Sequence, residues 1–279
     1  MEILKIEGLC KKYPEFSMKN VTFSMESGTV MGFIGRNGAG KTTTLKSMLR
    51  LVHPDAGHVE ICGMDVAEQE LAVKAQIGFV TGSAAYYPRK RLGQLTAATR
   101  RFYPNWDEAR YQDCLRRFAL DEGKRVSELS EGMKVKYQLA LAMSHHAKLL
   151  ILDEPTSGLD PAARDDLLGL FLELVERDGA SVLFSTHITP DLDACADTIT
   201  YIRNGEIFAS EARRAFTERY RYLRTDEAAV SPELAAKLIA PQRHQGEIEG
   251  LLRTADAPEA GSPATLEQIM VHLEREVEA

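Results

Sequence analysis

Cysteines and long apolar runs are scarce in this sequence. Four cysteines, Cys10, Cys62, Cys114 and Cys195, are scattered over 279 residues without the paired spacing of a metal or redox motif. We therefore expect inert thiols in a reducing compartment. No stretch approaches the roughly 18 apolar residues of a membrane-spanning helix, and the first residues lack the pattern of a secretory signal. These features predict a cytoplasmic protein whose own chain does not span a membrane.

An excess of positive charge is also missing. The chain has 34 lysines and arginines against 41 aspartates and glutamates, which gives a net charge of −7. Because nucleic-acid phosphates are bound by basic faces, this balance argues against nucleic acid as the main partner. A chain of 279 residues is long enough for one large domain or for one domain with an appendage.

The clearest motif lies at residues 30–42. Val30 to Ile34 is typical of a buried strand, residues 35–42 fit the phosphate-loop pattern G-x-x-x-x-G-K-[ST], and a helix is expected from Thr42. N–H groups nested at a helix N-terminus bind anions, so a chance glycine-rich turn is disfavoured. Lys41 is expected to reach the β- and γ-phosphates of a nucleotide, and the Thr42 hydroxyl to ligate Mg²⁺. The residues of this segment expected to bind the nucleotide are Gly35, Asn37, Gly38, Ala39, Gly40, Lys41, Thr42 and Thr43.

A second apolar run, residues 148–154, ends in two carboxylates. It is typical of a central parallel strand, and ligands of open α/β sheets bind beyond the carboxyl ends of the strands. Asp153 is expected to hold Mg²⁺, and Glu154 to polarise an attacking water. Two surface carboxylates at a strand end are the alternative, which the upstream phosphate loop disfavours. His187 follows another buried run, residues 180–186, and is either a γ-phosphate contact or a structural histidine.

Helical periodicity between Leu92 and about Lys148 predicts a helical subdomain inserted into the sheet. Within it Ser130 is expected to cap a helix, and with Gly132 it forms a second candidate anion site, although a plain helix cap explains the same residues. His145 and His146 are expected to end that helix, where imidazole favours the helix dipole, and not to bind a metal.

Two further positions complete the pattern. Asp160 or Pro161 is expected to open the next helix, after the loop at residues 157–160. Tyr13 lies in a break between strand-like segments near the N-terminus. It is either a surface aromatic or a platform on which a nucleotide base stacks, and the residues alone leave both open.

Together these residues resemble the ATP-binding cassette family, the nucleotide-binding domains of ABC transporters. The resemblance covers residues 1 to about 210. It rests on the phosphate loop, the signature-like segment 129–133, the strand ending in Asp153 and Glu154, the loop 157–160 and His187, in the family's order. It implies an α/β P-loop NTPase core with a mainly parallel sheet, an N-terminal antiparallel β subdomain and an inserted α-helical subdomain at about 83–147, within a nucleotide-binding domain of residues 1–212.

The resemblance also implies how the chain works. ATP and Mg²⁺ would be bound between two cassettes paired head to tail, with Glu154 and His187 as catalytic residues. Each ATP would touch the phosphate loop of one copy and the Ser130 region, which includes Gly132, of the other, and Asp160 is a further expected ATP-binding residue. Separate membrane-spanning permease subunits would hold the pair on the inner face of the cell membrane. Tyr13 falls where the family has its base-stacking aromatic.

The sequence departs from the family pattern in two places. Glu131 and Met133 replace the third and fifth residues of the usual LSGGQ, while Ser130 and Gly132 are kept, so ATP sandwiching is expected to survive. Gly82 stands where the family has a glutamine that meets Mg²⁺ and the attacking water. Either Ser83 or a water substitutes for it, or hydrolysis is slower and differently coupled.

Residues 213–279 are expected to form a C-terminal accessory region. Arg213 and Arg214, together with residues 219–224, form a basic, aromatic-interleaved helix candidate. Residues 254–263 have the composition of a linker. Residues 264–278 are expected to form an amphipathic helix that docks onto the cassette or onto its twin. Its apolar stripe consists of Leu266, Ile269, Met270, Leu273 and Val277.

Three functions are compatible with a phosphate loop. The favoured one is the ATPase subunit of a membrane transporter, similar in build to bacterial exporter ATPases, which converts ATP and water to ADP and phosphate. A soluble cassette ATPase acting on ribosomes or DNA is disfavoured, because only one phosphate loop and no sustained heptad run are present. A GTPase is disfavoured because no asparagine begins an Asn-Lys-x-Asp pattern, and a kinase because Glu154 and His187 suit water activation.

Overall fold

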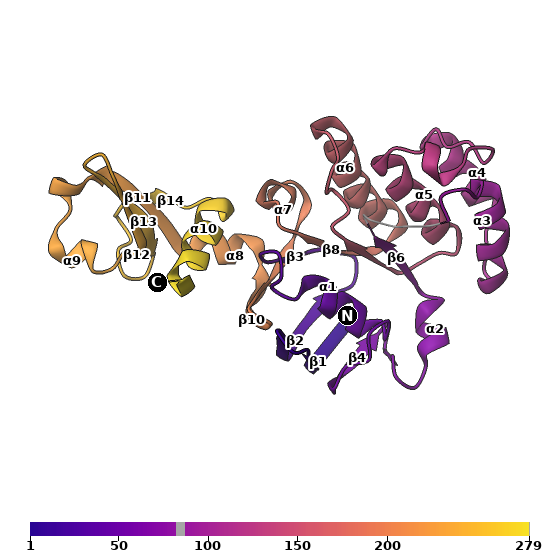
Figure 1. The fold of residues 1–279 in the computed structure, drawn as a ribbon, viewed down its shortest axis with the longest axis horizontal. Coiled ribbons are helices and arrows are strands. Elements are labelled where there is room, and N and C mark those ends of the chain that lie inside the picture. Colours follow the sequence, from indigo (N-terminus) through magenta and orange to yellow (C-terminus); the bar gives the residue numbers. More distant parts are fainter. Residues whose placement is uncertain (82–86, 279) are drawn as a thin grey trace. The chain divides into compact units, whose positions relative to one another are not determined.

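The structure is a computed structural model that describes residues 1–81 and 87–278 (Figure 1). The chain divides into two compact units. The first, the cassette unit, comprises residues 1–187 and 194–210, and the second, the C-terminal unit, comprises residues 188–193 and 211–279. Among the described residues, no helix combines the length and apolar character of a membrane span.

The cassette unit is built on a six-stranded sheet of order β10-β9-β3-β8-β7-β6. Strand β3 pairs in parallel with β8 and β9, and β7 pairs in parallel with β8 and β6. Strands β9 and β10 are joined at Asn204 and Gly205, which both have positive φ (50° and 79°), as a type I′ turn requires. The strands are β3 (Val30–Ile34), β6 (Ile77–Thr81), β7 (Leu149–Asp153), β8 (Ser181–Thr186), β9 (Thr198–Arg203) and β10 (Glu206–Ala212).

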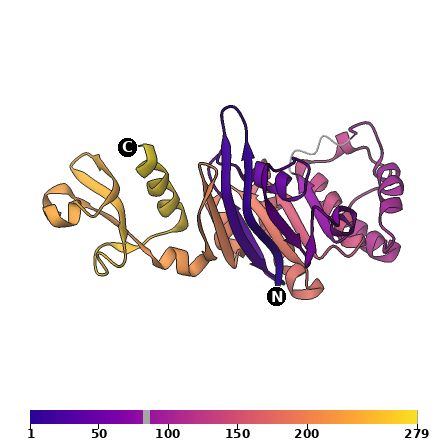
Figure 2. The same cartoon turned by 90° about the horizontal axis from the view of Figure 1, so that it is seen from below.

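A second, antiparallel sheet of order β2-β1-β4-β5 forms the N-terminal part of the cassette unit, and its long β1–β2 hairpin is prominent in Figure 2. Its strands are β1 (Glu2–Lys12), β2 (Ser17–Glu26), β4 (Ala56–Ile61) and β5 (Met64–Asp65). In β2, Val21, Phe23 and Met25 alternate with exposed residues and are buried. Phe23 stacks on Phe33 of β3 with ring centroids 5.5 Å apart, so the two sheets share one core.

Helices gather between β6 and β7, as the sequence predicts (Figure 1). A buried cluster of hydroxyl groups joins three of them: Thr96 Oγ1 lies 2.7 Å from the Tyr111 hydroxyl and 2.9 Å from the Tyr137 hydroxyl. The helices of the cassette unit are α1 (Lys41–Met48), α2 (Glu70–Lys74), α3 (Leu92–Thr99), α4 (Glu108–Arg117), α5 (Glu131–Ser144) and α6 (Pro161–Asp178), and α7 (Thr189–Cys195) follows β8. The predicted fold class, a P-loop core with an antiparallel β part and an inserted helical part, is confirmed.

His145 and His146 follow the last residue of α5 as expected, and His145 is its C-cap, but the expected favourable interaction of His145 with the helix dipole is wrong. The helix ends at Ser144, and His145 is only 5% exposed, stacked on Tyr103 with ring centroids 3.8 Å apart. Burial lowers the pKa of His145 to about 4, because the charged imidazolium would be poorly solvated there. The ring is therefore neutral near pH 7 and contributes no positive charge to the helix dipole.

The C-terminal unit is a four-stranded antiparallel sheet of order β12-β13-β11-β14 with helices. The predicted helix at residues 219–224 is wrong, because only α8 is helical and Tyr220–Asp226 forms β11, paired with β13 over seven residues. The alternation of arginine with tyrosine is a strand period, and it buries Tyr220. The remaining elements are α8 (Arg213–Glu218), α9 (Pro232–Ala235), β12 (Ile239–His244), β13 (Glu247–Arg253), β14 (Ser262–Pro263) and α10 (Leu266–Glu278).

Two more expectations for this region need correction. The predicted linker ends too late, since Ser262 and Pro263 pair with β11. The apolar stripe of α10 packs on β12 and β13 of its own unit, an arrangement outside the two considered above. His272 of α10 contacts the Ala240 carbonyl oxygen through Nδ1 at 3.0 Å, and the buried stripe residues are Leu266, Ile269, Met270 and Leu273.

Candidate active site

The phosphate-loop segment joins β3 to α1 through glycines that no other residue can replace without strain. Gly38 and Gly40 have φ of 84° and 113°, in the left-handed region, and Gly40 is the N-cap of α1. A Cβ on Gly35 would lie 2.4 Å from the Ile202 carbonyl oxygen. Because the loop turns this tightly, its backbone N–H groups gather at the first turn of α1, where an anion is stabilised.

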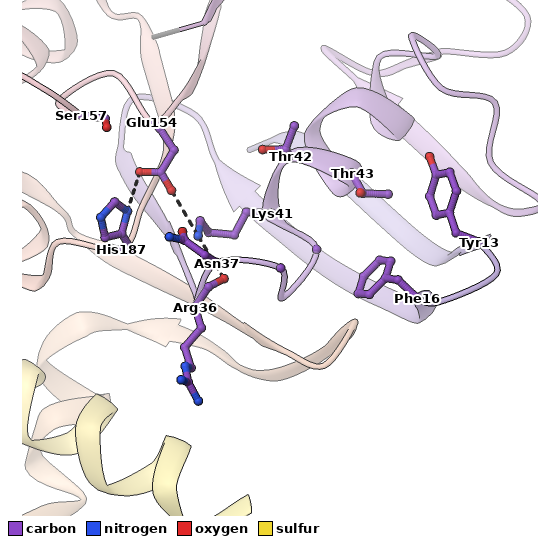
Figure 3. Close-up of a pocket in the computed structure, with 12 residues that line it drawn as sticks. Tyr13, Phe16, Arg36, Asn37, Lys41, Thr42, Thr43, Glu154, Ser157 and His187 are labelled. Carbon is purple, nitrogen blue, oxygen red and sulfur yellow. Dashed lines mark hydrogen bonds and ion pairs between the residues drawn. The ribbon is translucent and has the colours of Figure 1, made fainter. Parts of the chain in front are cut away.

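An open pocket of about 550 Å³ lies over this loop (Figure 3). It brings together residues from four separate parts of the sequence: the β1–β2 turn, the phosphate loop, the segment after β7 and the end of β8. Its lining residues are Tyr13, Phe16, Arg36, Asn37, Gly38, Gly40, Lys41, Thr42, Thr43, Glu154, Ser157 and His187.

Lys41, Glu154 and His187 form a chain of polar contacts in the pocket (Figure 3). Lys41 is 5% exposed, and its Nζ donates to the Gly35 carbonyl oxygen at 2.7 Å. The same Nζ lies 3.2 Å from Glu154 Oε1, while Glu154 Oε2 lies 2.9 Å from His187 Nδ1. One carboxylate thus holds an ammonium and an imidazole at a site suited to a terminal phosphate.

A second cluster lies beside the Lys41–Glu154–His187 contacts and consists of Thr42, Asp153 and Ser185. Thr42 Oγ1 donates to Asp153 Oδ1 at 3.0 Å, and Ser185 Oγ donates to the same oxygen at 2.8 Å. The Glu154 N–H donates in turn to Ser185 Oγ at 2.9 Å. A hydroxyl and a carboxylate are hard oxygen ligands of the kind Mg²⁺ prefers, so these residues fit that ion.

The backbone conformation of Glu154 is unusual. Its φ is 51°, an uncommon value for a residue with a side chain. Asp153 contacts Thr42, whereas Glu154 contacts Lys41 and His187. Adjacent carboxylates at the same strand end therefore belong to two different clusters, and the two roles expected of them stay predictions.

The far end of the pocket is aromatic. Tyr13 is 38% exposed, and its N–H donates to the Phe16 carbonyl oxygen at 2.7 Å in the β1–β2 turn. Phe16 packs against the phosphate loop, because a Cβ on Gly40 would lie 2.8 Å from Phe16 Cζ. Phe16 is not predicted from the sequence above, although an aromatic residue three positions after Tyr13 in the same turn is a usable signal. Figure 3 shows the two rings on the side of the pocket opposite Glu154 and His187.

Some of the predicted residues lie elsewhere. Ser130 is exposed and caps α5 by accepting from the Met133 N–H at 3.2 Å, and Asp160 caps α6 by accepting from the Ala163 N–H at 2.9 Å. Their two segments are neighbours, since a Cβ on Gly132 would lie 3.5 Å from Leu159 Cδ2. None of these residues lines the pocket, and neither do Gly35 and Ala39 of the phosphate-loop segment. Gly82 and Ser83 lie outside the described residues.

Comparison with known proteins is decisive for the family. The family model for the ABC transporter matches residues 18–157. The chain belongs to this family. Among its relatives, the ABC transporter ATP-binding protein NatA of Bacillus subtilis is 32% identical over 76% of this chain and 88% of its own length. The ABC transporter ATP-binding protein YtrB of the same species is 30% identical over 68% of this chain and 65% of its own length.

Solved structures agree with the fold. The structure of an ATP-binding subunit of an ABC transporter superposes with a TM-score of 0.68 at 30% identity, over 77% of this chain and 93% of that one. A dimeric ATP-binding cassette in a post-hydrolysis state, bound to ADP and phosphate, has the same fold at 23% identity and a TM-score of 0.66, over 75% of this chain and 98% of that one. The chain is thus of the ATP-binding type within the ABC transporter family.

Proposed function

We propose that this chain hydrolyses MgATP as the ATP-binding subunit of an ABC transporter, working in a head-to-tail pair that drives separate membrane-spanning subunits. The observation that carries the proposal is the pocket in which Glu154 joins Lys41 and His187 beside the Thr42–Asp153 cluster. These groups supply a phosphate-binding cation and a base in one cavity, with a metal site at its edge, where Thr42 lines the cavity and Asp153 lies behind it.

Binding of ATP would replace the Glu154 carboxylate by phosphate as the ionic partner of Lys41. Its ammonium contacts the Glu154 carboxylate, and the β- and γ-phosphates would take that place, aided by the N–H groups at the start of α1. Thr42 and Asp153 would hold Mg²⁺, which neutralises charge on the phosphates when bound. Tyr13 and Phe16 would receive the base and sugar at the other end of the pocket.

The released Glu154 carboxylate would then act as the base. Its contact with His187 keeps it at the phosphate end of the pocket, and from there it accepts a proton from a water aligned with the γ-phosphorus. His187 would contact the γ-phosphate itself. Water attack breaks the bond between the γ-phosphorus and the oxygen that it shares with the β-phosphorus, and ADP and phosphate result.

The second copy would supply what this pocket lacks. Ser130 lies at the N-terminus of the 14-residue helix α5, where N–H groups and the helix dipole favour a phosphate, yet it does not line the pocket. Asp160 lies at the start of the neighbouring helix α6. A head-to-tail partner would bring its own Ser130, Gly132 and Asp160 to the ATP on Lys41 and close the pocket from the open side.

The proposal also includes coupling to membrane-spanning subunits. Relatives include a bacitracin transport ATP-binding protein, BcrA of Enterococcus faecalis, at 26% identity over 91% of this chain and 84% of its own length. By analogy we place this subunit on the inner face of the cell membrane, bound to permease chains of an exporter. Residues 1–212 would form the nucleotide-binding domain, with residues 213–279 as an accessory region.

The dependence of the rate on protein concentration tests this proposal. Phosphate release from MgATP should be measured with the purified chain over about a hundredfold range of protein concentration. We expect the rate per chain to rise until pairs saturate, and to disappear when EDTA removes Mg²⁺. A rate per chain that is constant from the lowest concentration would contradict the pairing, and a chain without phosphate release at any concentration would contradict the proposed reaction.

A further inference from the structure

Helix α5, whose N-cap is Ser130, is hydrogen-bonded to the six-stranded sheet through one buried glutamine. Gln138 is 6% exposed and lies about two turns into the helix. Its Oε1 accepts from the Thr81 N–H at 3.1 Å, and its Nε2 donates to the Thr81 carbonyl oxygen at 3.2 Å. A single side chain therefore satisfies both backbone polar groups of Thr81.

The position of Thr81 gives this contact its meaning. Thr81 is the last residue of β6, which forms one edge of the six-stranded sheet, and on its other side it is the register partner of Asp153 in β7. In a strand the N–H and C=O of one residue point to the same side. The amide of Gln138 consequently takes the place that a further strand would occupy beside β6, on the opposite side of Thr81 from Asp153, whose carboxylate contacts Thr42.

Helix α5 also packs closely on strand β6. A Cβ on Gly78 of β6 would lie 2.4 Å from the Ala142 Cβ of α5. Ala142 follows Gln138 by one helical turn, and Gly78 precedes Thr81 by three residues, so helix and strand are in contact at two successive points. Breaking the Gln138 contact would leave the part-buried N–H and C=O of Thr81 without these partners, which is costly.

We propose that Gln138 is a positioning residue that makes hydrolysis at one ATP sensitive to the ATP on the opposite side of the pair. The inference rests on the proposed function, in which Ser130 receives the phosphate of the ATP held by the second copy. A shift of α5 on binding that phosphate moves Thr81 through the two hydrogen bonds, and the Thr81–Asp153 rung carries the shift to the metal cluster.

The replacement Gln138→Met tests this role, because methionine keeps the length of the side chain and removes both hydrogen bonds. The matched control is Gln112→Met, since Gln112 Nε2 donates to Glu108 of its own helix α4 at 3.0 Å. Amide exchange at Thr81, the Kd for a fluorescent ATP analogue, kcat and the Hill coefficient for ATP should be measured in full-length chains. If Gln138→Met does not fold, Gln138→Glu keeps the size and the acceptor while losing the donor.

We expect exchange at Thr81 to be at least about tenfold faster in Gln138→Met, with the analogue Kd within about twofold of wild type. The kcat should fall about tenfold, and the Hill coefficient should fall to 1 from a value above 1. Unchanged Thr81 exchange would overturn the contact itself. Faster exchange with wild-type kcat and Hill coefficient would overturn the positioning role. A wild-type chain that releases no phosphate refutes the proposed function and this role with it, and because Thr81 exchange needs no ATP, that failure is distinguishable from a missing contact.

Discussion

Replacing Lys41 with alanine is expected to raise the Kd for MgATP by about 100-fold and to abolish measurable phosphate release. The ammonium is buried and is aimed at the pocket by the Gly35 carbonyl oxygen. Its loss removes the cation for the phosphates and also leaves the Glu154 carboxylate without its ion pair, so that this negative charge repels the triphosphate. Titration with a fluorescent ATP analogue measures the change in Kd.

Lys19→Ala is the matched control for this replacement. Lys19 is 65% exposed and pairs with Glu206 at 3.6 Å, outside the pocket lining. An exposed ion pair contributes little, so both Kd and rate should stay within about twofold of wild type. If Lys41→Ala bound MgATP as tightly as Lys19→Ala, the phosphate-loop lysine would not be the phosphate ligand.

Replacing Glu154 with glutamine is expected to lower the hydrolysis rate by about 10² to 10⁴-fold while ATP binding is retained. Glutamine cannot accept the proton of the attacking water. It also frees Lys41 from a carboxylate, so the Kd for MgATP should fall slightly. Because bound ATP then persists, a pair of chains should accumulate on sizing chromatography in MgATP and not in MgADP.

Glu176→Gln, on the exposed face of α6, is the control for this replacement. It removes one carboxylate from the same unit without touching the pocket, and its rate and elution should match wild type. A Glu154→Gln chain that hydrolyses ATP at the wild-type rate would show that another group is the base. A monomer in both nucleotides, with ATP bound, would mean that closure needs a different cassette or the membrane subunits.

Much of the cassette unit was predictable because its signals are local. The phosphate loop is specified by consecutive residues, and the adjoining strand β3 and helix α1 follow from apolar and glycine positions near it. The caps Ser130 and Asp160 likewise bond to residues three positions away. Even the different contacts of Asp153 and Glu154 follow from their order at the end of a strand.

What escaped prediction depends on partners that are distant in the sequence. Gln138 lies 57 residues from Thr81, and nothing in the helical pattern of α5 marks it as a partner of the sheet edge. The burial of His145 depends on stacking with Tyr103, which the helix end alone does not reveal. The apolar stripe of α10 needed a surface, and strands β12 and β13 were not anticipated as that surface. The error at β11 had another cause. The strand-like alternation of its side chains is visible in the sequence, but the helix was predicted from their basic charge.

The central claim is that each ATP is held by the phosphate loop of one copy and by Ser130 of the other. Two variants that are each expected to be inactive test it: Lys41→Ala, which lacks the phosphate ligand, and Ser130→Arg, which blocks the opposing surface. A mixed pair has one pocket with both defects and one pocket with none. Phosphate release should therefore appear when the two inactive chains are mixed, at up to about half the rate of a wild-type pair for each mixed pair. If the mixture stays as inactive as its components while the two chains are shown to pair, the ATP sites are not shared between copies in this way.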